Sequence, residues 1–396
     1  EIKECDWSSD VCSSDLFFGG LIMNKFLITI ATLVAFALGS VAVQAQEVSG
    51  FMQRIVGAGD DVDGGIAEQF TRFNIAAEKT ADNGWVVGGS MSIQTAATTG
   101  GTYGPSTNHM YIATDMATIN VGNTMDALTS LVPAVSAMVP GGGVDAGYQF
   151  LFDAGNLGHN TVSARESYYA NNSAKIDIDF PSVNGFTVGI SYTPSMEFTG
   201  PTQARQQAET TANHGETVHV AASYSGDMDG LSYVIGAGII SGNAQSQSAG
   251  SASAVTNNDL SAVSAAIKIT MGNMTIGLAG YDNGASWGAS TDTQKANSSG
   301  WNSSIVWVMG NISVGAGYNH QELTRGTRAQ AAATTLTSAD AGNVREDNHT
   351  FVGVGYDMGG GVNTYVQLSN NDHSDGDHAT TEVDPQVLFA GINIGF

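Results

Sequence analysis

Three charged side chains share one face of the segment Ala174 to Phe180. Lys175, Asp177 and Asp179 alternate there with apolar residues. Side chains of a β-strand point alternately to its two faces, so the charges lie on one face and the apolar groups on the other. The charged face therefore lies against water and the other face against something apolar. Charged side chains on such a face attract or repel ions electrostatically, and this requires no covalent chemistry.

Further charges that could act in the same way are few. Arg54 and Arg72 fall in the first two segments that alternate, and Asp126 and Asp145 fall in the longest connector. For each of them the alternative is an ordinary solvated surface residue. We single out Arg54, Arg72 and Lys175 as candidate basic groups of a site, with Asp126, Asp145 and Asp177 as the acidic ones.

Two acidic clusters offer the oxygen ligands that calcium prefers. They are Asp60-Asp-Val-Asp-Gly64 and Asp372-His-Ser-Asp-Gly-Asp-His378, the second with Asp372, Asp375 and Asp377 as candidate ligands. Neither is followed by a Glu at the EF-hand spacing. Polar loop tips explain both clusters more simply, so we predict no resident metal and keep calcium at the second cluster as the alternative.

Covalent catalysis has little support. A hydrolytic enzyme, such as a lipase or protease, needs a nucleophile and a base within reach of each other. Most histidines fall in expected loops, and no pairing of His with Ser and Asn stands out; the loop histidines are His109, His159, His214, His320, His349, His373 and His378. We predict a protein that is not an enzyme and that binds no cofactor.

The composition points to a wall between water and lipid. Only 13% of the 396 residues are charged, and the chain has 50 Gly but 7 Pro. Soluble proteins carry about 25% charged residues. With 37 Asp and Glu against 13 Lys and Arg, the chain lacks the basic clusters that phosphate binding requires, so nucleic acid is excluded as a partner.

The first 45 residues are set apart from the fold. Residues 1–22, which contain both cysteines, have no usable pattern and resemble translated adapter sequence. Residues 23–45 have a short basic start, an apolar core and small residues at Val43-Gln-Ala45, as expected of a secretory signal peptide. A transmembrane helix is the alternative. We assign residues 46–396 to a β-barrel.

From Glu47 onward the chain shows sixteen candidate strands, grouped as hairpins. The clearest are residues 186–192, 231–239, 274–278, 312–318 and 362–368. Tight turns with Gly or Asn join them at one end, at Asp82-Asn-Gly84, Asn184-Gly185, Asp229-Gly230, Met271-Gly-Asn273, Met309-Gly-Asn311 and Gly359-Gly-Gly361. Long polar connectors join them at the other, at 95–108, 195–215, 242–258, 283–299, 322–346 and 371–384. The pattern predicts an all-β fold, a 16-stranded antiparallel transmembrane β-barrel.

The connector from Asn123 to about Arg165 is the longest and is partly apolar. Apolar surface of that extent is unfavourable in water. We expect this long third loop to fold into the lumen of the barrel, with Asp126 and Asp145 at the opening. The alternative is a partly helical loop packed on the outer rim.

The order of several short motifs resembles the general porins of Gram-negative bacteria, most closely those of alphaproteobacteria. The motifs are a first strand from Val48 to Val56, Thr71-Arg-Phe-Asn-Ile75, Asp82-Asn-Gly-Trp85, a long loop after Ile119-Asn-Val-Gly122, and the terminal Phe396. The resemblance implies a homotrimer of sixteen-stranded barrels, each narrowed by its third loop. It also implies a pore constriction at which acidic groups of the loop face basic groups of the wall, so the six charged candidates above are expected there. It also implies that the last strand is recognised by the outer-membrane assembly machinery.

Together, pattern and resemblance predict an outer-membrane channel for passive diffusion of small hydrophilic solutes and ions. The acidic balance predicts weak cation selectivity. A substrate-specific channel with a lumenal binding site is the alternative, with Tyr281 and Tyr365 as stacking residues. Outer-membrane lipids and lipopolysaccharide are expected around it. Candidates for the aromatic girdles at the membrane interfaces are Phe396, Tyr192, Tyr224, Tyr318, Tyr356 and Trp307.

Overall fold

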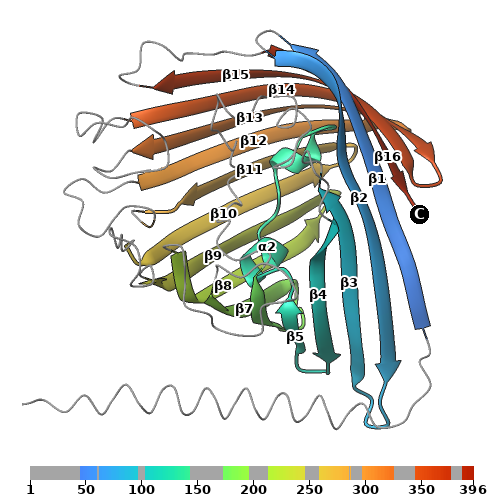
Figure 1. Ribbon diagram of the computed structural model, residues 1–396, viewed down its shortest axis with the longest axis vertical. Helices are drawn as coiled ribbons and strands as arrows, with labels where there is room; N and C mark the ends of the chain where they lie inside the picture. Colours follow the sequence, from blue (N-terminus) through green and yellow to red (C-terminus); the bar gives the residue numbers. More distant parts are fainter. Residues whose placement is uncertain are drawn as a thin grey trace, which may run out of the picture.

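Sixteen antiparallel strands form a closed barrel in the computed structural model (Figure 1). The structure describes residues 45–59, 62–96, 103–142, 173–195, 213–245, 258–284, 286, 297–324, 344–375 and 386–396. The strands are β1 (Ala45–Gly59), β2 (Val62–Thr80), β3 (Val86–Ala96), β4 (Tyr103–Ala113), β5 (Thr118–Asn123), β6 (Ala174–Asp179), β7 (Phe186–Ser195), β8 (Asn213–Met228), β9 (Leu231–Gln245), β10 (Leu260–Met271), β11 (Met274–Asp282), β12 (Asn297–Met309), β13 (Ile312–Thr324), β14 (Val344–Gly359), β15 (Val362–Asp375) and β16 (Gln386–Gly395).

Pairing of β1 with β16 closes the barrel. Near the start of β1, the Gly50 N–H donates to the Phe396 carbonyl at 2.8 Å, and the Phe396 N–H donates to the Gly50 carbonyl at 3.0 Å. Closure removes the open sheet edge that hydrocarbon does not tolerate. The prediction of a 16-stranded antiparallel barrel is confirmed.

The short turns have the backbone geometry that their residues predict. Asn184 and Gly185 have φ of 52° and 85°, and Asp229 and Gly230 have 48° and 83°. Two successive residues with positive φ are typical of the tight hairpin turns that match strand twist. These turns, the start of β1 and the end of β16 lie at one end of the barrel, called here the turn end. The opposite end is called the loop end.

The two faces of the wall differ in exposure as the alternation predicts. On β15, Val366 and Leu368 are 49% and 51% exposed, whereas Tyr365 and Gln367 are 6% and 0% exposed. An exposed row of large apolar side chains on the outer face suits hydrocarbon. The alternation along residues 362–368 thus separates an outer from an inner face of the wall.

The strands run further into the polar connectors than expected. The connector placed at 322–346 begins only after Thr324 and ends before Val344, and the one placed at 95–108 is reduced to 97–102 between β3 and β4. Ladder hydrogen bonds use the backbone, so a strand continues after its side chains become polar. Hydropathy alone therefore sets the strand ends too early.

The described part of the third loop, residues 124–142, lies inside the ring of strands (Figure 1). It contains the short helix α2 (Ala127–Leu131) and the 3₁₀ helix η1 (Ser136–Met138). Helix α2 contacts β6 to β9, and η1 contacts β12 and β13. Residues 124–142 thus lie against the inner face of the wall, and the course expected for the whole loop stays a prediction. Residues 143–172, including Asp145, lie outside the described residues.

No helix within the described ranges is long and apolar enough to cross a membrane.

Candidate functional site

The first residues of the third loop are held by a buried cluster of charged groups. Asp126 caps α2, accepting from the Thr129 N–H at 2.9 Å. Its Oδ1 atom also lies 3.2 Å from Nδ1 of His219, on β8. Both side chains are almost fully buried. The first carboxylate of the loop therefore fixes the loop to the barrel wall.

Two residues of β6 complete this cluster, which we call the loop anchor. The Lys175 ammonium donates to the carbonyl of Thr124. Asp177 accepts from the Ser191 hydroxyl at 2.7 Å and from the Asn120 amide at 3.1 Å. The Ser191 oxygen in turn accepts from the N–H of Ala127, the first residue of α2, at 2.6 Å. Buried charges are tolerated because they are paired and hydrogen-bonded in this way.

The anchor keeps Asp126 ionised. Burial alone would raise the pKa of this carboxyl. The neighbouring His219 ring, the Thr129 N–H and the Lys175 charge outweigh burial and lower the pKa of Asp126 to about 2. A carboxylate that accepts several hydrogen bonds behaves in this way.

Beyond the anchor, the loop follows a line of wall glycines. A Cβ atom on Gly236 of β9 would lie 2.4 Å from the Leu131 carbonyl oxygen, and one on Gly353 of β14 would lie 2.1 Å from the Pro140 carbonyl oxygen. Between them, Gly277 of β11 and Gly315 of β13 face Val135 and Val139 at 2.8 and 3.3 Å. Glycine permits close approach of another backbone. We call this line the glycine track, and it holds the loop flat against β9 to β14.

The candidate charges separate into three groups. Asp126, Lys175 and Asp177 come together in the loop anchor. Arg72 lies on the inner face of β2, where its guanidinium is 5.4 Å from the centre of the Phe51 ring. Arg54 lies on the outer face of β1, between the exposed Met52 and Val56, while its neighbour Gln53 bonds the inward Tyr365.

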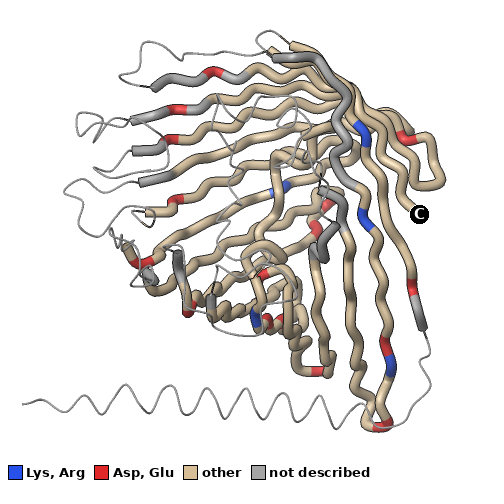
Figure 2. The backbone as a smooth tube through the Cα atoms, in the orientation of Figure 1, with Lys and Arg blue, Asp and Glu red and all other residues tan. Residues whose placement is uncertain are grey.

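The alternation also contains an inward cation that sequence reasoning missed. Lys268 of β10 pairs with Gly277, whose inner side faces the third loop. Ile267 and Ile269 flank it, so the period of two was the available signal. Figure 2 shows how sparsely charges occur along the strands. The exposed loop side chains in 127–142 are Ser130 and Ala137, neither of them charged.

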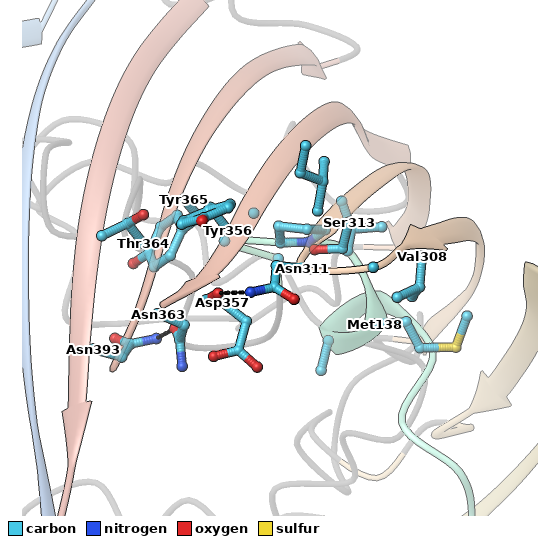
Figure 3. A pocket seen from close by; sticks show the side chains of 18 of the residues that line it. Met138, Val308, Asn311, Ser313, Tyr356, Asp357, Asn363, Thr364, Tyr365 and Asn393 are labelled. Atoms are coloured by element: carbon cyan, nitrogen blue, oxygen red, sulfur yellow. Dashed lines mark hydrogen bonds between the residues drawn. The ribbon is translucent and has the colours of Figure 1, made fainter. Parts of the chain in front are cut away.

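A cavity of about 400 Å³ lies between the third loop and the turn end (Figure 3). One wall of the cavity consists of five polar side chains at matching positions on neighbouring strands, which we call the polar row. They are Asn311 at the turn before β13, Asp357 on β14, Asn363 on β15, Asn393 on β16 and Gln53 on β1. Loop residues 137–142 lie against the same cavity. Opposite cross-strand neighbours are close enough for their side chains to act together.

The two tyrosines proposed as a stacking slide are both buried. The Tyr365 hydroxyl accepts from the Gln53 amide at 3.0 Å, and its ring packs against Phe389. Tyr281 belongs to the apolar cluster around the third loop. Neither ring is open to a passing solute, so an aromatic slide at these residues is wrong.

The six girdle candidates all lie on the outer face, in two groups. Tyr224, Tyr356, Trp307 and Phe396 lie toward the turn end; Tyr192 and Tyr318 lie toward the loop end. Ring contacts support both groups, with Phe73 5.6 Å from Phe396 and Trp301 5.1 Å from Tyr318. Their placement at the membrane interfaces stays a prediction.

Neither a metal site nor a nucleophile is indicated in the part of the chain that the structure describes. No three His, Cys, Asp or Glu side chains there are gathered around one point. Asp372 is exposed, and the side chains of Asp375 and Asp377 lie outside the described residues, so calcium remains a hypothesis.

The sequence contains one Gly-x-Ser-x-Gly pentapeptide, residues 284–288, the pattern typical of a nucleophile elbow. Its Ser286 is buried, and the hydroxyl donates to the Asn283 carbonyl at 2.6 Å. It also accepts from the Ser261 N–H at 3.0 Å. A nucleophile needs an exposed hydroxyl and a base within reach. Ser286 therefore closes a turn.

Known structures share this architecture. The trimer form of OmpT, an outer membrane protein of Vibrio cholerae, aligns with a TM-score of 0.56 and 11% identity, covering 89% of this chain and 99% of that chain. A mutant of the Rh. blastica porin gives 0.54 and 18%, covering 89% and 100%. The anion-selective porin from Comamonas acidovorans gives 0.60 and 10%, covering 89% and 99%. At these identities the likeness shows the fold.

Family membership rests on the sequence itself. No curated protein matches the chain. The family described as Gram-negative porin matches residues 29–376, which is most of the chain. The resemblance seen in the motifs is thereby confirmed: the chain belongs to the Gram-negative porin family and forms a channel in the outer membrane.

Proposed function

We propose that the barrel is a general pore for passive diffusion of small hydrophilic solutes and ions, with weak cation selectivity. One contrast in burial carries the proposal. Inner-face residues beside the loop, such as His219 on β8 and Gln367 on β15, are 0% exposed, whereas Arg72, Asn74 and Ser90 on β2 and β3 are only half-buried. Open space beside β2 and β3 is what a water-filled path requires.

The loop supplies the narrow point of this path. Its residues 124–142 are fixed at the anchor and along the glycine track, so this part of the loop lies against one side of the wall, β6 to β14. Outside the loop anchor, Arg72 and Lys268 are the described inward cations, and Asp145 is the acidic candidate in the remainder of the loop. We leave Arg54 out of the constriction because it lies on the outer face.

Selectivity follows from the overall charge. The full sequence carries 37 acidic and 13 basic residues, and most of this acidic excess lies in residues 46–396. The pore therefore attracts cations and repels anions over about 8 to 10 Å at physiological salt. Reconstitution in a planar bilayer tests this: we expect ohmic conductance, and a reversal potential under a KCl gradient with the sign of potassium preference. Absence of conductance contradicts the pore, and a chloride preference contradicts the selectivity. Neither cofactor nor catalytic step enters this function.

The remaining expectations belong to the same proposal. Residues 23–45 export the chain and are removed, and residues 1–22 are foreign to it. Edman sequencing of the mature protein tests the first point, and the mass of the uncleaved precursor made in the native cell tests the second. The protein assembles as a homotrimer, as the trimer form of OmpT does. Outer-membrane lipids and lipopolysaccharide cover the apolar outer face, and the assembly machinery recognises the strand that ends at Phe396.

A substrate-specific channel remains the second candidate function. The observation that favours it is the polar row beside the cavity at the turn end, since a featureless pore does not require five amide and carboxylate groups in one line. Saturation of the solute flux distinguishes it from simple diffusion.

A further inference from the structure

The polar row is built to present both donors and acceptors to one small space. Asn311, Asp357, Asn363, Asn393 and Gln53 come from the turn before β13 and from four neighbouring strands, and their register places them on one line across the inner wall. Figure 3 shows Asp357, Asn363 and Asn393 side by side at the edge of the cavity. Such convergence of polar groups in a cavity of about 400 Å³ is typical of a small-molecule site.

Each side chain of the row is oriented by one hydrogen bond and keeps another group available. Asn393 Nδ2 donates to Asn363 Oδ1 at 3.0 Å, which leaves the Asn363 amide N–H groups as donors. Asp357 Oδ1 accepts from the Gly359 N–H at 2.8 Å, which leaves its second oxygen. Gln53 donates to Tyr365 at 3.0 Å, which leaves its carbonyl oxygen.

One atom of the row lacks a partner. Asn393 Oδ1 is buried and makes no hydrogen bond within the described residues. A buried amide oxygen without a partner costs about 1 to 3 kcal/mol, and such atoms are rare in native proteins. A ligand hydroxyl that donates to this oxygen would satisfy it.

The chemistry of the row selects a neutral solute. Four of the five side chains are amides, and Asp357 is the one carboxylate. Amides donate and accept in turn, as vicinal hydroxyl groups do, and the carboxylate accepts from hydroxyls strongly. The opposite side of the cavity is formed by Met138, Val139 and Pro140 of the third loop, which suit the C–H face of a sugar or polyol.

We propose that the polar row is a binding subsite for a neutral polyhydroxylated solute of monosaccharide size, at the turn end of the pore. This proposal rests on the proposed function. The solute's hydroxyls donate to Asp357, Gln53 and Asn393 and accept from Asn363. Binding here delays a solute that has already passed the third loop, so flux saturates while the ion path stays open.

Glucose added to single channels in a planar bilayer tests this proposal. In the unaltered protein we expect glucose to reduce conductance with saturation. In the double variant Asn363→Ala, Asn393→Ala the half-saturating concentration rises about tenfold, as two lost hydrogen bonds predict. Asn273→Ala is the matched control, the same exchange at a turn of the same end outside the row; it leaves the saturation curve unchanged. Heat-modifiable gel mobility verifies folding of each variant.

Three outcomes overturn the inference. The first is a linear fall in conductance equal for glucose and for diethylene glycol dimethyl ether, which has no hydroxyl donors. The second is saturation by glucose that the double variant leaves unaltered. The third is saturation by ethanolammonium and none by glucose, which assigns the row to cations through Asp357. A protein that conducts no ions at all contradicts the proposed pore instead, so the two failures are distinguishable.

Discussion

Asp126 and His219 meet at 3.2 Å inside the barrel, and this contact joins the first turn of the third loop to strand β8. Lys175 lies near enough to lower the pKa of the same carboxyl, and it also bonds the Thr124 carbonyl. The loop is thus attached by a closed group of opposite charges, and removal of any member leaves another buried without its partner.

Replacing Asp126 by Asn removes the negative charge and keeps the helix cap, because Asn caps helices as well as Asp does. The variant leaves His219 and Lys175 buried without the carboxylate, so we expect the free energy of unfolding to fall by about 3 kcal/mol. Equilibrium urea unfolding in lipid vesicles measures this. Asp115→Asn, at the exposed turn between β4 and β5, is the control and shifts stability by less than about 0.5 kcal/mol. Equal midpoints for both variants contradict the anchor.

The anchor predicts a dependence on acid. The pKa of Asp126 is lowered from 3.8 to about 2 in the folded protein. Its stabilisation is therefore fully present above about pH 5, amounts to about 2 kcal/mol, and is lost as the pH falls through 2. His219, Lys175 and Asp177 are the other ionisable groups around it. Open-channel noise should rise between pH 5 and 2.5, and Asp126→Asn should be equally noisy at both values. Noise in that variant that still changes with pH contradicts this assignment.

The barrel was predictable from the sequence where alternation is unbroken. Residues 362–368 alternate cleanly, and both faces of β15 follow. Around Arg54 the pattern fails, since Ile55 and Val56 are both apolar and a register shift lies between Gln53 and Arg54. Hydropathy therefore could not assign the Arg54 side chain to the inner or to the outer face.

The loop anchor was predictable only in part. Asp126 could be placed in an inward loop, and Lys175 and Asp177 could be placed on a wet face of a strand. Nothing in local sequence, however, indicates that His219 of β8 faces Asp126, because that contact depends on the path of the loop across the wall. The same reason hides the glycine track, whose four members lie on four different strands.

Adding a methyl group to the glycine track should displace the loop. A Cβ at Gly353 would lie 2.1 Å from the Pro140 carbonyl oxygen, and backbone cannot move aside as a side chain can. We expect Gly353→Ala to lower stability by about 1 to 3 kcal/mol and to broaden the distribution of single-channel conductances. Gly280→Ala is the control, since the nearest atom to its Cβ lies at 3.6 Å. A single conductance level in Gly353→Ala, equal to that of the control, would show that the glycine track does not hold the third loop in position.

Barrel closure predicts the effect of removing the last residue. Phe396 makes two backbone hydrogen bonds to Gly50, and its ring lies 5.6 Å from Phe73. Deletion of Phe396 loses both bonds, worth about 1 kcal/mol each, and the aromatic contact. We expect a lower unfolding midpoint in vitro and a lower amount of folded barrel in outer-membrane fractions. Phe396→Tyr keeps the bonds and the ring and should behave as the unaltered protein. Normal yield and midpoint after deletion would falsify this role.

The two inward cations predict how selectivity can be tuned. Arg72 on β2 and Lys268 on β10 lie on the inner face, whereas Arg54 lies on the outer face. A cation inside the pore repels permeant cations within about a Debye length, and that repulsion weakens with salt. Arg72→Gln and Lys268→Gln should each raise the potassium-to-chloride permeability ratio, by roughly twofold at 0.1 M KCl and less at 1 M. Arg54→Gln removes the same charge from the outer face and should leave the ratio unchanged. Reversal potentials of the three variants under one gradient decide the matter: a shift in Arg54→Gln as large as in Arg72→Gln would mean that net charge alone, and not position on the inner wall, sets the ion preference.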